Sequence, residues 1–202
     1  MRIPSIEEAE AFSGQRPSID DYIHEMWEVL SFDHEDLFLG GAHDTLLPHD
    51  PNESHYVYVS EKENLAEVQD YYAQVRATVI DKIRNGEIEG YAEGDVLDIE
   101  IKQLPHDKPG ILHIPKRGLS PGIDRYSKGT FYNWDSAFMI RGLVQDGRVD
   151  LAKDMVDNLL YEIEHYDGPL NANSTFCLSK DAQGNLRKPR AQLPLVASKV
   201  LT

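Results

Sequence analysis

The chain has 202 residues, of which 41% are hydrophobic and 27% charged, as in an ordinary globular protein with one substantial core or a core with an appended segment. Its formal net charge of −15 argues against nucleic acid as a partner, because nucleic-acid binding needs a basic surface. The acidic excess belongs to the first half. Residues 1–110 hold 25 of the 35 acidic and 8 of the 20 basic side chains, a charge of −17, whereas residues 111–202 carry +2, which suits an uncharged ligand.

Cysteine content and hydropathy indicate the compartment. No apolar run approaches the roughly 20 residues that cross a bilayer, so no membrane partner is expected. The N-terminal residues 1–8 lack the apolar core of a secretory signal. The single cysteine, Cys177, cannot form an internal disulfide, and the chain needs no oxidising compartment. These features favour a cytoplasmic protein.

The predicted elements begin with two short helices. A capping box at residues 5–8 opens the first, and Ser18 begins a second that reaches about Leu30. Residues 31–59 have the pattern of irregular loops. No two of the potential metal ligands there have the i, i+4 spacing that fixes a metal on a helix, so neither a metal site nor a cofactor is predicted. These ligand types are His43, Asp44, His49, Asp50 and His55.

The clearest helical pattern follows a capping box at residues 60–63 and is expected to stop at Gly86. An alternation over residues 96–101 predicts one short strand. The next segment is rich in proline and glycine and is expected to be an extended connector with an ordered piece near residues 111–114. We therefore expect an acidic, mostly helical segment over residues 1–110, followed by a second domain over residues 111–202.

The second domain is predicted to open with an antiparallel helix pair. One helix runs from about Phe131 to Gln145, and the second begins near Asp150 after a turn at Gly147. A segment rich in amides and hydroxyls follows, and Pro194 fits the start of a further helix. The apolar stripe of the second helix is expected to comprise Leu151, Met155, Val156, Leu159, Leu160 and Ile163.

The stretch Phe-Tyr-Asn-Trp-Asp-Ser-Ala-Phe at residues 131–138 combines aromatic rings with a carboxylate, an amide and a hydroxyl at a helix start. A pyranose has apolar C–H faces that stack on aromatic rings, and hydroxyls that bond to carboxylates and amides. The stretch is therefore a candidate sugar contact. Aromatic residues near a helix start are more often core anchors, so packing is the alternative interpretation.

Three motifs of the second half resemble, in the same order, those of the trehalase family of glycoside hydrolases (family 37). A Pro-Gly-Gly-Arg-Phe element followed by a Tyr-Trp-Asp-Ser helix start is similar to residues 121–126 and 132–136. A Pro-Asn-Gly-Asn-Arg-Thr loop is similar to residues 170–175. An Arg-Ser-Gln-Pro-Pro helix start is similar to residues 190–194. The resemblance covers residues 121–196, and its specificity comes from the order of the motifs.

The resemblance implies a sugar subsite built from side chains of all three motifs. Aromatic rings and a carboxylate would line it, and an asparagine would exchange hydrogen bonds with ring hydroxyls. Arginine and glutamine would complete a polar rim, because a guanidinium can hold two vicinal hydroxyls. The side chains that the resemblance implies as substrate-binding are Arg125, Tyr132, Trp134, Asp135, Asn171, Arg190 and Gln192.

The implied fold is mainly α. It is the N-terminal part of an (α/α)6 barrel of the six-hairpin glycosidase type, incomplete, and preceded by the acidic helical segment with its short strand. The family hydrolyses its substrate with inversion, using one carboxylic acid and one carboxylate base. In the family both lie downstream of the third motif, so they are expected beyond Thr202, and none is assigned here. Asp135 corresponds to a sugar-binding aspartate.

Departures from the family pattern keep several functions open. Ile123 replaces a glycine, Ser174 replaces the loop arginine, and extra residues lie within 179–189. One interpretation is a trehalase-like hydrolase of α,α-trehalose or a similar α-glucoside, with this chain inactive alone. A second is a glycosidase acting on glucosylglycerate or mannosylglycerate. A third is a non-catalytic helical carbohydrate-binding or interaction protein in which self-association replaces the missing barrel portion.

Overall fold

The structure is a computed structural model, and it describes residues 18–42, 54–122 and 129–178. The predicted first helix and the helix at Pro194 lie outside these ranges. Helix α2 (Ile19–Leu30) begins as predicted, because the Ser18 hydroxyl accepts a hydrogen bond from the Asp21 backbone N–H at 3.1 Å. None of its residues is fully buried.

The region predicted as irregular is more ordered than expected in its described parts. Strand β1 (Ser31–Phe32) pairs antiparallel with β5 (Gly118–Leu119). A short helix α3 (His34–Asp36), capped by the Asp33 carboxylate, leads into one π turn, η1 (Leu37–Gly41). The irregular pattern was therefore wrong for this segment, whose elements are too short to show a hydrophobic period.

Helix α4 (Leu65–Arg84) begins later than its predicted capping box. Asn64 caps it, with the side-chain oxygen accepting from the Ala66 N–H at 3.2 Å. The buried Ser60 hydroxyl instead donates to the His165 carbonyl at 3.0 Å. The end of the helix is as predicted, because Gly86 has a positive φ of 74°.

A three-stranded parallel sheet has the order β3-β2-β4. Its strands are β2 (His55–Val59), β3 (Ile99–Gln103) and β4 (Ile111–Leu112). The predicted strand at residues 96–101 corresponds to β3, shifted toward the C-terminus, whereas β2 was not predicted. Helix α4 packs on this sheet and buries Val68, Tyr72 and Val79 with β2. A short 3-10 turn, η2 (Glu93–Asp95), lies between α4 and β3.

Helices α5 (Asn133–Gln145) and α6 (Val149–His165) form the predicted antiparallel pair, turning at Gly147, where φ is 76°. A core cluster joins the pair to β1 and β5 and includes Phe32, Leu119, Phe131, Leu143, Met155 and Leu159. The predicted stripe on α6 is partly wrong, since Leu160 and Ile163 are 48% and 39% exposed. The buried face carries Asn158 and Glu162 instead, and a 3-10 turn, η3 (Thr175–Cys177), follows the pair with Cys177 buried.

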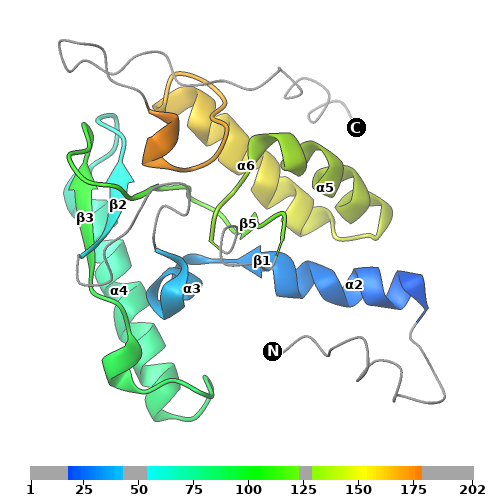
Figure 1. Ribbon diagram of the computed structural model, residues 1–202, viewed down its shortest axis with the longest axis horizontal. Coiled ribbons are helices and arrows are strands. Elements are labelled where there is room, and N and C mark those ends of the chain that lie inside the picture. The colour runs from blue at the N-terminus through cyan, green and yellow to red at the C-terminus, as the bar shows by residue number, and fades with distance from the viewer. Residues whose placement is uncertain (1–17, 43–53, 123–128, 179–202) are drawn as a thin grey trace.

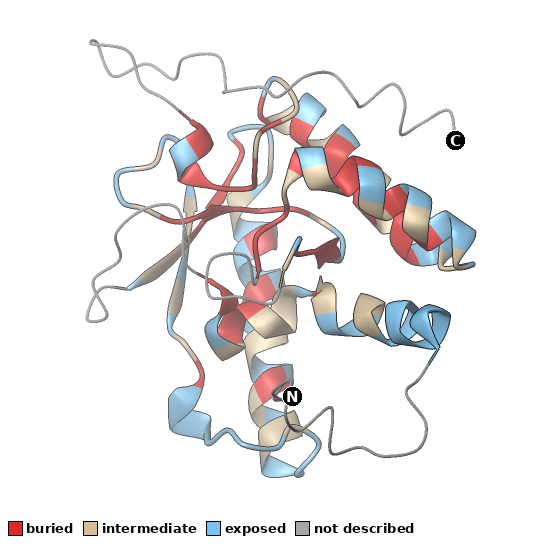
Figure 2. Cartoon of the chain, turned by 45° about the vertical axis from the view of Figure 1, so that its right-hand side comes forward, coloured by how far each residue is buried: buried red, intermediate tan, exposed pale blue. Residues whose placement is uncertain are grey.

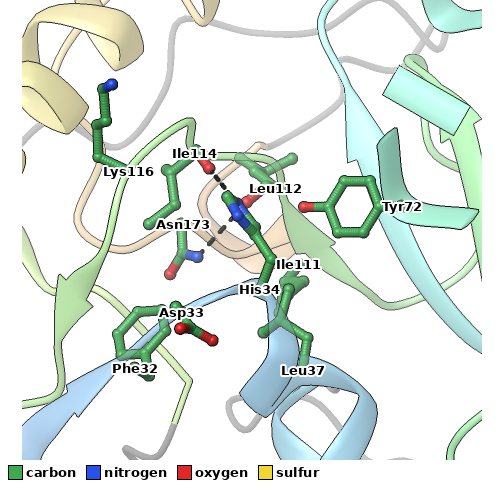
Figure 3. Close-up of a pocket in the computed structure, with 10 residues that line it drawn as sticks. All are labelled: Phe32, Asp33, His34, Leu37, Tyr72, Ile111, Leu112, Ile114, Lys116 and Asn173. Carbon is green, nitrogen blue, oxygen red and sulfur yellow. Dashed lines mark hydrogen bonds between the residues drawn. The ribbon is translucent and has the colours of Figure 1, made fainter. Parts of the chain in front are cut away.

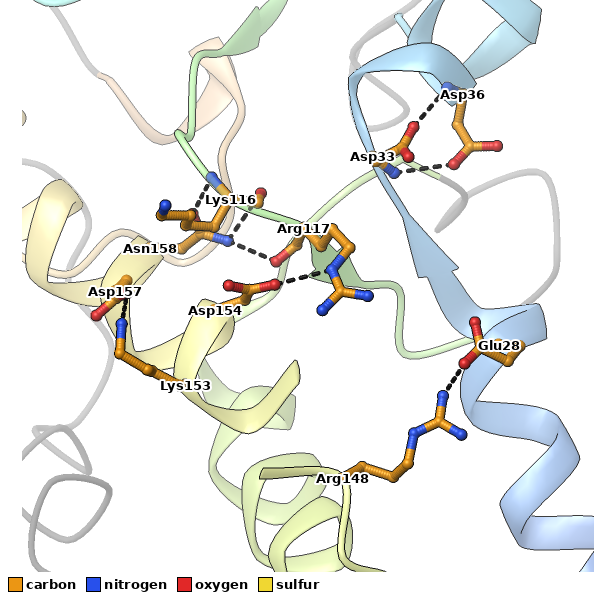
Figure 4. Close-up of polar contacts among 10 residues, drawn as sticks. All are labelled: Glu28, Asp33, Asp36, Lys116, Arg117, Arg148, Lys153, Asp154, Asp157 and Asn158. Atoms are coloured by element: carbon orange, nitrogen blue, oxygen red, sulfur yellow. Dashed lines mark hydrogen bonds and ion pairs between the residues drawn. The ribbon is translucent and has the colours of Figure 1, made fainter. Parts of the chain in front are cut away.

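Asn158 shows how α6 is attached to the preceding chain. Its side-chain oxygen accepts from the Lys116 N–H at 2.9 Å, and its amide nitrogen donates to the carbonyls of Lys116 and Arg117 at 3.2 and 2.9 Å (Figure 4). Beside it, the Arg117 guanidinium pairs with Asp154 at 2.8 Å. A buried asparagine thus satisfies the backbone groups of Lys116 and Arg117 where this segment packs against α6.

The helix pair and α4 lie on opposite sides of the strands, and buried residues run between them (Figures 1 and 2). The fold is mainly helical, as expected, with a small sheet that the expectation lacked. Contacts join the two segments predicted to meet near residue 110, because β4 pairs with β2 and Trp27 of α2 packs over Gly142 of α5. The division at that residue remains a prediction. Within the described ranges, every helix is too short or too polar to span a membrane.

Candidate functional site

Two segments distant in the sequence lie side by side at the start of α5. Tyr132 forms an antiparallel bridge with Ala172, and the Asn133 N–H donates to the Asn171 carbonyl at 3.0 Å. The Asn173 N–H in turn donates to the Phe131 carbonyl at 3.2 Å. The helix start and the amide-rich loop, which the sequence singled out separately, therefore form one paired structure.

Asn173 joins these two paired segments to the sheet by hydrogen bonds. Its side-chain oxygen accepts from the Phe131 N–H at 2.7 Å, and its amide nitrogen donates to the Leu112 carbonyl of β4 at 3.4 Å. Its own carbonyl accepts from the Leu112 N–H at 2.9 Å. The side chain is 1% exposed, so this asparagine acts within the protein and not at its surface.

Four of the predicted substrate-binding residues lie on the paired segments. Tyr132 is partly buried and precedes α5, and Trp134 and Asp135 stand in its first turn. Asn171 is partly exposed on the loop. The structure thus brings their backbones together. The other three, which are Arg125, Arg190 and Gln192, lie outside the described residues.

The aromatic residues of the stretch divide between the two interpretations. Phe131 is fully buried in the core cluster, as a packing anchor would be. Trp134 is 38% exposed and Phe138 is 57% exposed, with their ring centroids 6.2 Å apart. A half-exposed indole at a helix start leaves a face for a ligand. Burial in the core accounts for Phe131, whereas Trp134 keeps more than a third of its surface exposed.

Two hollows among the described residues are lined by neither Trp134 nor Asn171. A cavity of about 10 Å³ lies between His34, Tyr72 and Asn173, among other residues (Figure 3), and it has room for one water molecule. A ligand pocket is usually hundreds of Å³, so this cavity is too small for a sugar. An open hollow of about 670 Å³ lies between α2 and the end of α5. It is lined by Asp20, Ile23, Trp27, Gly142, Gln145 and Asp146.

Two histidines, the buried His113 and the partly buried His34, stack beside the small cavity with ring centroids 5.6 Å apart. His34 Nε2 lies 2.7 Å from the Ile114 carbonyl, which only accepts, so Nε2 carries the proton and Nδ1 accepts from the Tyr71 hydroxyl at 2.7 Å. Burial lowers the pKa of His113 to about 3 and also lowers the pKa of His34. Both rings are therefore neutral at pH 7. Among the described residues there is no cluster of three metal-ligating side chains.

Sequence reasoning missed the residues that hold the paired segments together. Glu162 is completely buried, and its Oε2 accepts from the Asn133 side-chain amide at 2.9 Å and from the Leu170 N–H at 3.2 Å. Glu162 lies on the amphipathic helix α6, and hydrophobic periodicity does not mark a charged residue as buried. Its contact with the stretch at residues 132–135 was therefore not predicted. Asn173 stood within a quoted motif and was assigned no role.

Residues 51–183 match the model of the trehalase family. This range is more than half of the chain and contains both the start of α5 and the paired loop. It begins well before the motif resemblance at residue 121 and ends before Arg190. The acidic first half is thus in part family sequence.

Curated relatives are the cytosolic neutral trehalase of Kluyveromyces lactis, 30% identical over 103 residues, and probable trehalases of Saccharomyces cerevisiae, 31% over 130 residues, and Eremothecium gossypii, 45% over 108 residues. In the same order, the alignments cover 45%, 58% and 42% of this chain. They cover 14%, 16% and 15% of those proteins, so this chain spans a small part of their length.

A solved structure has a similar fold over most of the chain. Neutral trehalase Nth1 from Saccharomyces cerevisiae superposes with a TM-score of 0.56 at 21% sequence identity, covering 80% of this chain and 31% of that one. The partial coverage agrees with the expected incomplete barrel. The family match over residues 51–183, more than half of the chain, shows that this chain belongs to the trehalase family.

Proposed function

We propose that this chain carries part of the sugar subsite of a glycoside hydrolase that cleaves α,α-trehalose or a similar α-glucoside with inversion. The observation that carries the proposal is the backbone pairing of the α5 start with the loop at Asn171. It sets the segment that carries the partly exposed Trp134 indole and the Asp135 carboxylate beside the segment that carries the Asn171 amide. The names of the relatives, all trehalases, support the substrate class.

Each side chain has a role in this proposal. The Trp134 face stacks on the C–H face of a pyranose, while Asp135 and Asn171 bond to its hydroxyls. Arg125, Arg190 and Gln192 complete the polar rim. Inverting hydrolysis needs an acid and a base about 6.5–9.5 Å apart, and we assign neither to the described residues. The chain alone is expected to bind sugar without hydrolysing it. The relative named as cytosolic supports a cytoplasmic location.

Calorimetric titration of the 202-residue chain with trehalose tests the proposal. We expect binding that weakens at least about tenfold in Trp134→Ala, as the loss of a stacking aromatic contact predicts. The matched control is Trp27→Phe on α2, which lies in the other hollow and should keep the wild-type affinity. Titration with glucosylglycerate distinguishes the alternative glycosidase. Equal affinities of the wild type and Trp134→Ala would refute the subsite.

One observation favours a second candidate, a non-catalytic helical binding protein that self-associates. Large apolar side chains are exposed on both helices of the pair, namely Phe138, Val144, Leu160 and Ile163. Exposed apolar surface is usually covered by another chain or by the rest of a domain. Light scattering separates the two cases. A defined oligomer that binds sugar supports the second candidate, whereas polydisperse association supports part of a barrel.

A further inference from the structure

A buried carboxylate near the end of α6 joins the two segments of the proposed subsite. Glu162 is 0% exposed, and one oxygen, Oε2, accepts from both the Asn133 side-chain amide and the Leu170 backbone N–H. Burying a carboxylate is unfavourable unless hydrogen bonds compensate for its lost hydration. An apolar side chain would fill this position at lower cost if packing were its only purpose.

The two donors stand at informative positions. Asn133 immediately precedes Trp134, and Leu170 immediately precedes Asn171. Asn133 is itself nearly buried and is held from two sides, because its backbone N–H donates to the Asn171 carbonyl while its side chain donates to Glu162. Asn173, by comparison, ties the Phe131 backbone to β4. In comparison with Asn173, Glu162 is the residue whose hydrogen bonds reach the immediate neighbours of Trp134 and Asn171.

We propose that Glu162 is a positioning residue for sugar recognition, a role that rests on the proposed function. Its carboxylate sets the first turn of α5 against the loop at Asn171, so that the indole and the two polar side chains keep one relative placement. Because it is fully buried, Glu162 itself does not touch the sugar. It acts through Asn133 and Leu170.

The acceptor is the part of Glu162 that matters for this role. Glu162→Gln keeps an oxygen within reach of both donors, whereas Glu162→Leu keeps the volume and removes the acceptor, leaving two buried donors without it. Leu151→Ala, at the opposite end of α6, is the matched control, since it weakens the core without touching either donor.

The first measurement needs no sugar. Amide hydrogen exchange in the 202-residue chain should become about tenfold faster at Leu170 in Glu162→Leu, after correction for global stability, and stay near wild type in Glu162→Gln and Leu151→Ala. The side-chain amide resonances of Asn133 should shift only in the Leu variant. Unchanged exchange and resonances in Glu162→Leu would overturn the positioning role, and so would equal changes in Leu151→Ala.

The second measurement is trehalose affinity in the same variants. We expect a loss of about tenfold in Glu162→Leu and less than about threefold in Glu162→Gln, because the Gln variant keeps the acceptor. Asn133→Ala removes one donor and leaves the Leu170 bond, so it provides the same test if the Leu variant does not fold. Unchanged affinity in Asn133→Ala would contradict the role. A wild-type chain that binds no trehalose would instead overturn the proposed function. The exchange data would still show whether Glu162 positions the two segments.

Discussion

The two sides of the molecule are held together differently. Helix α4 covers the parallel sheet through apolar residues such as Val57, Val68 and Val79. On the side of the α5–α6 pair, buried polar side chains bond to particular backbone groups, as Asn158, Glu162 and Asn173 do. Apolar packing is non-directional and brings elements together, whereas hydrogen bonds fix individual atoms. The hydrogen bonds of Glu162 and Asn173 lie beside the candidate site at the start of α5.

The largest expected effect comes from the apolar core that the helix pair does share. Met155→Ala should lower the free energy of unfolding by about 3 kcal/mol, because the fully buried side chain would leave a cavity. Urea denaturation measures the change. Leu160→Ala on the same helix is half exposed and should cost less than about 1 kcal/mol. Equal losses in the two variants would show that the buried face of α6 is not the one described.

Next in size is a comparison of two asparagines of one loop. Asn173→Ala should cost about 2 kcal/mol, because it leaves the buried Phe131 N–H without its acceptor. Asn171→Ala should cost less than about 0.5 kcal/mol, since Asn171 pairs through its backbone carbonyl, which the substitution keeps. Sugar affinity should show the stronger direct dependence on Asn171. Thermal unfolding and titration of both variants sharpen the distinction between holding and binding.

A comparison of pH dependence concerns the sheet side, where His113 and Tyr72 share a hydrogen bond of 3.0 Å. The folded chain takes up a proton at His113 only near pH 3, whereas an unfolded histidine does so near pH 6.5. Acid therefore favours the unfolded chain. Stability is fully present above about pH 6.5 and falls by at most about 1.4 kcal/mol per pH unit toward pH 3.

The measurement is urea denaturation of the wild type and His113→Phe between pH 4 and 7. The lowered pKa of His34 adds a dependence of the same sign, which both proteins share. The difference between the two slopes isolates His113. Parallel slopes would mean that the pKa of His113 is the same in the folded and unfolded chains, contrary to the effect of its burial.

The elements that the sequence predicted well are those with local signals. The Ser18 cap, the Gly147 turn and the presence of helices α4, α5 and α6 depend on neighbouring residues, and the structure has all of them. Strand β2 was missed although its sequence, His-Tyr-Val-Tyr-Val, is rich in β-branched and aromatic residues, and its partners β3 and β4 lie more than forty residues further along the chain. Pairing at that distance leaves no local pattern beyond β-branched and aromatic residues.

The candidate site follows the same division. The order of the motifs suggested that the residues after Phe131 and those around Asn171 belong together, and the backbones of the two segments are paired. Glu162 was invisible to hydrophobic periodicity, which assigned the buried face to Leu160 and Ile163. The helix is turned to bury Asn158 and Glu162 because their partners, Lys116 and Asn133, come from other elements. The sequence of α6 alone therefore does not indicate these partners.

The burial of Cys177 allows openings of the loop that follows α6 to be measured chemically. It is the sole thiol of the 202 residues and lies fully covered, immediately after the segment that contains Asn171 and Asn173. A maleimide dye reacts with it only when that turn swings outward. The rate at which Cys177 is labelled therefore measures how often the loop opens, and no engineered cysteine is needed.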